Sequence, residues 1–228
     1  MTKSFFVAGI AAAALCAMPL VASAVPTLNL LDSSTQGVGN TADIFGADFD
    51  GTTPLGATWS GAAPVVTPPP GNANGSFQSP FNNTGLVGTQ SYFSVGGSNG
   101  GNGGSSPMTL TYDSLQDNFT FLWGSIDSYN EIEFFDANGV SLGGSTGSGV
   151  IAALNLPGSP NNFEQVALLE YVFGANEMFK SVTFTSSSAA FEFALPAAVP
   201  LPAAAWMLIS AIAGLGFVSS RRRRSAAA

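Results

Sequence analysis

Histidine is absent from the sequence and cysteine occurs once, which removes several kinds of catalysis at the outset. Without an imidazole there is no Ser-His-Asp or Cys-His catalysis and no histidine-ligated zinc site. The single cysteine, Cys16, lies in an N-terminal segment that we expect to be removed. The mature chain would then have neither a disulfide nor a thiol nucleophile.

Basic residues are also scarce, and nearly all of them lie at the two ends of the chain. The 228 residues include 6 Lys and Arg against 14 Asp and Glu, and between residues 25 and 199 only Lys180 is basic. Because no basic patch can neutralise phosphates, nucleic acid is not expected as a partner. The 18 Phe, 3 Trp and 4 Tyr are too many for a disordered chain, and this length suits one domain with a substantial core.

Residues 1–24 have the three-part layout of a secretory signal peptide. Lys3 supplies the positive charge, residues 5–15 are apolar, and Ala22 and Ala24 form a small-x-small cleavage site. We therefore expect export by the general secretion machinery and cleavage by signal peptidase. The alternative is an uncleaved membrane anchor.

An uncharged apolar stretch occupies residues 202–220, and as a helix it would be about 28 Å long. That length nearly matches the ~30 Å hydrocarbon core of a bilayer, so we expect a transmembrane helix. The stretch is followed by a stop-transfer run of arginines: Arg221, Arg222, Arg223 and Arg224. These arginines would remain cytoplasmic, which places residues 25–199 on the outer side of the membrane.

A short proline-containing motif directly precedes the apolar stretch: Val199, Pro200, Leu201, Pro202 and Ala203. Together the motif, the apolar helix and the arginine run resemble the PEP-CTERM sorting signal, in the variant that reads VPLPA. The resemblance covers residues 199–228 and implies recognition by an exosortase, a membrane-embedded cysteine protease-transpeptidase of Gram-negative bacteria. It further implies cleavage near the motif, followed by release to, or attachment at, the cell surface.

The segment from residue 25 to residue 198 has the pattern of an all-β domain. Several short runs alternate apolar and polar residues with a period of two, which places one set of side chains on a buried face. The apolar members of these runs are Met108, Leu110, Tyr112, Phe119, Phe121, Trp123, Ile132, Phe134, Val182, Phe184, Phe191 and Phe193. Strands separated by turn signals, with few helical stretches, favour a β-sandwich of jelly-roll type.

Four segments between these runs complete the prediction of a single domain. Residues 136–139 (Asp-Ala-Asn-Gly) predict a tight turn, because Asn and Gly tolerate a positive φ. Residues 63–75 are proline-rich and residues 96–107 are a Gly/Ser/Asn tract, so both are expected to be loops. Residues 163–173 fit a helix or a strand, and their Val, Tyr and Phe residues favour the strand.

A second resemblance lies in the centre of the chain. A Trp-Gly-Ser-x-Asp-x-Tyr-Asn stretch is formed here by Trp123, Gly124, Ser125, Asp127, Tyr129 and Asn130. It resembles a family of exosortase-dependent bacterial surface proteins, over roughly residues 108–195. The resemblance implies a secreted β-sandwich surface protein without an established enzymatic activity, so it supplies no catalytic residues.

Paired carboxylates are the one route to hydrolysis that needs no histidine. Glu131 and Glu133 are expected to share a strand face, with Asp127 and Asp136 nearby. Alternate residues on a strand lie about 6–7 Å apart, and glycosidases need two carboxylates about 5–10 Å apart in a cleft. Any Glu-x-Glu strand that faces solvent meets this spacing, so we interpret the pair as part of a solvated face rather than as catalytic.

The candidate calcium ligands are Asp43, Asp48 and Asp50, in an Asp-x-Asp-Gly context that resembles half of a calcium loop. The bidentate glutamate of an EF-hand is missing, and an ordinary polar loop is the alternative. Trp59, Trp123 and Tyr129 could form a stacking platform for sugar rings. Because Trp123 shares a face with Phe119 and Phe121, packing in the core is the favoured interpretation.

These observations predict a non-enzymatic secreted or cell-surface protein of the envelope or the exopolysaccharide matrix, with glycan binding as a candidate role. The chain would pass through an inner-membrane intermediate with a periplasmic domain before it reaches the cell surface or the medium. No cofactor is expected beyond the candidate calcium. Two alternatives stay open: a secreted polysaccharide hydrolase that uses paired carboxylates, and a permanently anchored single-pass protein.

Overall fold

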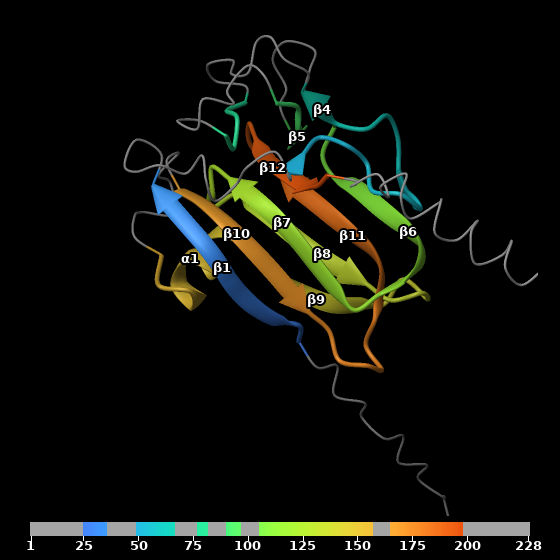
Figure 1. The fold of residues 1–228 in the computed structure, drawn as a ribbon. Helices are drawn as coiled ribbons and strands as arrows, with labels where there is room; N and C mark the ends of the chain where they lie inside the picture. The colour runs from blue at the N-terminus through green and yellow to red at the C-terminus, as the bar shows by residue number, and fades with distance from the viewer. Residues whose placement is uncertain are drawn as a thin grey trace, which may run out of the picture.

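The computed structural model describes residues 25–35, 49–66, 77–81, 90–96, 105–156 and 165–197. The described chain is mostly strand, with one short helix, and its strands form two antiparallel sheets (Figure 1). The prediction of an all-β domain is therefore confirmed at this level.

The larger sheet has seven strands and contains both the first and the last strands of the described chain. Its order is β1 (Thr27–Thr35), β10 (Gln165–Val172), β7 (Asn118–Gly124), β12 (Phe191–Pro196), β5 (Tyr92–Val95) and β4 (Val65–Val66), and β2 (Phe49–Asp50) also pairs with β12. Strands from distant parts of the sequence are thus hydrogen-bonded neighbours, as β1 with β10 and β7 with β12.

The smaller sheet has five strands. Its order is β3 (Ala57–Trp59), β6 (Met108–Gln116), β11 (Phe179–Ser186), β8 (Asn130–Phe135) and β9 (Ser141–Thr146). The short helix α1 (Gly147–Ala153) follows β9, and the Thr146 hydroxyl caps it by accepting the Gly149 N–H at 3.1 Å. This helix was not predicted, because its Gly-Ser-Gly start resembles a loop and only Val150 and Ile151 provide an apolar face.

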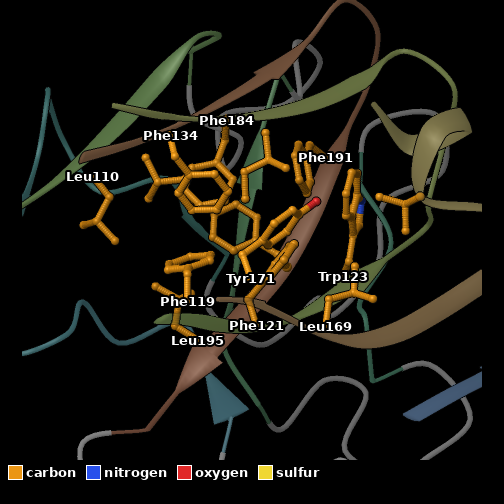
Figure 2. Packing of buried hydrophobic residues seen from close by; sticks show 14 of the residues in the cluster. Leu110, Phe119, Phe121, Trp123, Phe134, Leu169, Tyr171, Phe184, Phe191 and Leu195 are labelled. Carbon is orange, nitrogen blue, oxygen red and sulfur yellow. The ribbon is translucent and has the colours of Figure 1, made fainter. Parts of the chain in front are cut away.

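The two sheets pack face to face across an aromatic core (Figure 2). Phe184 of the five-stranded sheet stacks on Phe193 of the seven-stranded sheet, with ring centroids 4.1 Å apart. Phe134 and Tyr171 also meet across the two sheets, as a tilted pair with ring centroids 4.9 Å apart. The predicted alternation is confirmed: each predicted apolar member of the runs is either buried in this core or, for Tyr112, packed against it.

The outer face of the seven-stranded sheet carries a second apolar cluster, which the alternation did not predict. It consists of Val66, Phe77, Phe81, Tyr92, Leu122, Val166 and Ala194, with Phe49 and Leu168 packed against it. Residues 77–81 contribute two of these side chains and lie over the sheet. Strands β5, β7 and β12 are consequently buried on both faces over most of their length.

Two local predictions are confirmed as well. Residues 165–172 form a strand rather than a helix, and residues 136–139 form a turn in which Gly139 has φ +77°. The predicted signal peptide, most of the loops at residues 63–75 and 96–107, and the sorting signal at residues 199–228 lie outside the described residues. Within the described ranges, no helix has the length and apolar character that crossing a membrane requires.

Candidate functional site

The predicted carboxylate pair lies on the outer face of the five-stranded sheet. Glu131 and Glu133 share one side of β8, and Glu131 is exposed. The Ser141 hydroxyl donates to Glu133 Oε1 at 2.6 Å. Asp136 lies in the following turn, where backbone N–H donors, first among them that of Val140, hold its pKa below the usual value. Asp127 belongs to a different, buried part of the molecule.

The two tryptophans among the aromatic candidates are used for packing. Trp123 is fully buried and stacks on Phe191 with centroids 4.5 Å apart (Figure 2). Trp59 is half-buried, lies 5.1 Å from the Phe93 ring and donates from Nε1 to Thr53 Oγ1. The interpretation of Trp123 as a core residue is therefore confirmed.

The Trp-Gly-Ser-x-Asp-x-Tyr-Asn stretch runs from the end of β7 to the start of β8 and crosses from one sheet to the other. At its first turn, Gly124 lies against Pro80, and a Cβ on this glycine would fall 2.6 Å from the proline Cβ. Ser125 adopts a positive φ of 49°. A side chain at position 124 would thus displace the segment that covers the seven-stranded sheet.

Asn130 and Tyr129 attach this stretch to the turn between β11 and β12. Asn130 Nδ2 donates to the Ala190 carbonyl at 3.1 Å, and its Oδ1 accepts from the Ser186 hydroxyl at 2.7 Å. Tyr129 Oη lies 3.1 Å from the Ala189 carbonyl oxygen. The stretch therefore holds together two connections that are about 60 residues apart in the sequence.

Asp127 is buried behind this turn, with 1% of its surface exposed. Tyr129 Oη is 2.8 Å from Asp127 Oδ2 and donates to it. Burial raises the pKa of Asp127 to about 6, although the Tyr129 hydrogen bond lowers it in part. Because a hydroxyl has one hydrogen, Tyr129 can satisfy Asp127 and the Ala189 carbonyl together only when Asp127 itself carries a proton.

Glu192 is the functional candidate that sequence reasoning missed. It lies on β12 with 2% exposure and faces outward between Ser94 of β5 and Gly124 of β7. The Gln78 N–H donates to its Oε1 at 2.8 Å. Burial, and to a smaller extent the charge of Asp127, raises the pKa of Glu192 to about 8.

Three buried oxygens in this region make no hydrogen bond in the described part of the chain: Asp127 Oδ1, Glu192 Oε2 and Ser94 Oγ. We call Asp127, Glu192 and Ser94 the carboxylate cluster. It combines two acidic groups and a hydroxyl, and no Lys or Arg among the described residues faces it: the one described cation, Lys180, donates to the Asp113 carbonyl.

The other predicted sites are placed only in part. Asp50 is described, and both of its carboxylate oxygens accept hydrogen bonds from Thr52. Asp43 and Asp48 lie outside the described residues, as do Ala22, Ala24, the motif at residues 199–203 and the arginine run at residues 221–224. Calcium binding at Asp43, Asp48 and Asp50 stays a prediction.

Comparison of the chain with protein-family models, with curated proteins and with solved structures finds no match.

Proposed function

We propose that this chain is an exported, non-enzymatic surface protein that an exosortase sorts through its C-terminal signal. The observation that carries the proposal is the order of three features within 30 residues: the motif at residues 199–203, the apolar stretch at 202–220 and the arginines at 221–224. The stretch has the length of a membrane span, and the arginines oppose its translocation. The N-terminal segment would start the same export route.

The domain between the two signals would be a jelly-roll-like β-sandwich of the envelope or the exopolysaccharide matrix. Two antiparallel sheets that pack face to face support this reading. The central Trp-Gly-Ser-x-Asp-x-Tyr-Asn stretch supports a scaffold role as well, because Trp123 packs in the core and Asn130 binds a neighbouring turn. Export through the inner membrane would make that membrane a transient location.

Intact-mass analysis of the protein recovered from its native host tests this proposal. We expect a product that has lost residues 1–24 and the arginine tail. The double variant Pro200→Ala/Pro202→Ala should keep the tail and accumulate in the inner membrane. As a control, Pro68→Ala/Pro69→Ala removes two prolines outside the motif and should be processed normally. A wild-type product that retains Arg221 to Arg224 would assign the chain instead to permanently anchored proteins.

A further inference from the structure

We propose that the carboxylate cluster is a binding site for a hard divalent cation of the calcium type. The site lies on the outer face of the seven-stranded sheet, beneath residues 77–81. It uses other residues than the predicted calcium ligands Asp43, Asp48 and Asp50, and it does not depend on how the chain is sorted.

The register of the sheet brings the first two ligands together. Glu192 is the direct cross-strand partner of Ser94, and both residues face outward on strands that are hydrogen-bonded neighbours. Side chains at such positions have Cβ atoms about 4.5–5.5 Å apart. On the other side of Glu192, the partner is Gly124, against which Pro80 packs so closely that a Cβ on the glycine would fall 2.6 Å from the proline Cβ.

Asp127 approaches from the connection between β7 and β8. Its charge is close enough to Glu192 to contribute to the raised pKa of that group, and both carboxylates help to raise the pKa of Tyr129. The oxygens Asp127 Oδ1 and Glu192 Oε2 nevertheless make no hydrogen bond to each other. A cation between the two carboxylates would give both of these oxygens a partner.

The two oxygens of each carboxylate differ in their hydrogen bonding, and this difference also supports a cation site. Each carboxylate has one oxygen held by the protein: Asp127 Oδ2 by Tyr129 and Glu192 Oε1 by the Gln78 N–H. These bonds fix the orientation of the carboxylates, while the second oxygen of each, with Ser94 Oγ, stays available. Calcium prefers such oxygen ligands and accepts six to eight of them, so water and carbonyl oxygens would complete the shell.

Charge is the remaining argument. An isolated buried carboxylate is costly, and two of them repel each other, unless a cation or a proton neutralises them. The described residues supply no cationic side chain here, since Lys180 is engaged with Asp113. A divalent cation would balance both charges, and through Gln78 it would also hold the covering segment on the sheet.

Thermal unfolding of the full-length protein in mild detergent tests the proposal. With calcium at about a hundred times its dissociation constant, we expect Tm to be roughly 5–10 °C higher than in EDTA. Glu192→Gln should abolish the calcium-dependent rise, because it keeps the shape of the side chain and removes the charge. Glu131→Gln is the matched control on the exposed face of β8 and should show the wild-type response.

Terbium luminescence gives a readout that does not depend on stability. Terbium stands in for calcium, and Tyr129, which is bonded to Asp127, would sensitise its emission. We expect terbium emission in the wild-type protein and in Glu131→Gln, and we expect added calcium to abolish it by displacing terbium. Asp127→Asn and Ser94→Ala should each lower the affinity for terbium by roughly tenfold or more. The proposal is overturned if calcium changes neither the Tm nor the terbium emission of the wild-type protein. It is also overturned if calcium raises the Tm of Glu192→Gln as much as that of the wild type. A Tm that rises on acidification without any metal response would assign the cluster to a proton-sharing pair instead.

Discussion

The outer faces of the two sheets differ although the strands that form them have similar patterns. On β8, the sequence Glu-Ile-Glu places Glu131 and Glu133 outward on an open face beside the hydroxyls of neighbouring strands. On β12, the sequence Phe-Glu-Phe places Glu192 outward in the same way, yet residues 77–81 bury it. The difference teaches that strand alternation identifies the inner face, whereas the environment of the outer face depends on what covers it.

The largest expected effect comes from removing a side chain beneath the cover. Leu122 faces outward on β7 and is fully buried, so Leu122→Ala should lower the free energy of unfolding by about 2–5 kcal/mol. Thr183 faces outward on β11 of the other sheet, and Thr183→Ala should cost at most about 1 kcal/mol, from the bond to the Thr109 hydroxyl. Urea denaturation of both variants measures the contrast, and equal losses would show that the two outer faces are alike.

Buried Glu192 should make the stability of the protein depend on pH, whereas Glu133 on the outer face of the five-stranded sheet should not contribute to this dependence. In the folded protein the pKa of Glu192 is about 8, above its ordinary value of 4.5, so the folded state holds this proton more tightly than the unfolded chain. The resulting stabilisation is complete below about pH 4.5 and is lost as the pH rises toward 8, by on the order of a few kcal/mol. The pKa of Asp127, raised from 3.8 to about 6, adds a decrease of the same sign over its own, lower window.

Urea denaturation in EDTA between pH 5 and pH 8 measures this decrease. Glu192→Gln should reduce the dependence to the part that Asp127 contributes, because an amide does not titrate, and Glu133→Gln should keep the wild-type slope. A wild-type stability that is constant or increases over this range would contradict the assignment of Glu192 as a buried, protonated group.

A smaller effect is expected at the hydroxyl that connects Asp127 to the turn between β11 and β12. Tyr129→Phe removes the hydrogen bond to Asp127 Oδ2 and the contact with the Ala189 carbonyl, and should cost about 1–2 kcal/mol. Tyr112→Phe is the control on β6, because it keeps the ring that forms a T-shaped pair with Phe179 at 5.8 Å. Calorimetry of the two variants should give a clearly lower Tm only for Tyr129→Phe, and identical values would remove the role assigned to this hydroxyl.

The smallest effect is expected for the exposed pair. Glu131→Gln/Glu133→Gln should change the free energy of unfolding by less than about 1 kcal/mol, because both side chains lie on an open strand face. The same double variant, assayed on a panel of glycans, separates the proposed surface protein from the hydrolase. We expect unchanged glycan retention and no turnover for either protein, whereas turnover that disappears in the variant would favour the hydrolase.

The inner face of the domain was predictable because it depends on local sequence alone. A period of two in runs such as Met-Thr-Leu-Thr-Tyr identifies Met108 and Leu110 as core residues without knowledge of their partners. The same reasoning assigns Glu192 to the opposite face, but it does not say whether that face is covered. Whether that face is covered depends on residues 77–81, which lie more than 100 residues earlier in the chain.

One signal of the buried face was nevertheless present. The strands beside Glu192 read Tyr-Phe-Ser-Val and Phe-Leu-Trp-Gly, and they lack the alternation of a half-exposed strand. Continuous apolar runs are typical of strands that are buried on both faces. This signal marks β5 and β7 themselves, whereas the position of Glu192 between them follows only from the strand order of the sheet.

The Trp-Gly-Ser-x-Asp-x-Tyr-Asn stretch shows a second limit of prediction from the sequence. Its residues could be recognised together, but their individual roles could not be derived from spacing. Gly124 is required by Pro80, and Asn130 binds a carbonyl 60 residues later, so both roles arise only from tertiary packing. Asp127, considered first as a neighbour of Glu131, instead belongs with Glu192.

Carboxyl footprinting on the full-length protein tests the contrast between the two outer faces most directly. A water-soluble carbodiimide with an amine nucleophile modifies accessible carboxyl groups, and mass spectrometry locates them. The structure predicts rapid modification of Glu131, with Asp127 and Glu192 protected by roughly tenfold or more until the domain unfolds. Modification of Glu192 at the rate of Glu131 in the folded protein would contradict a covered acidic site on the seven-stranded sheet.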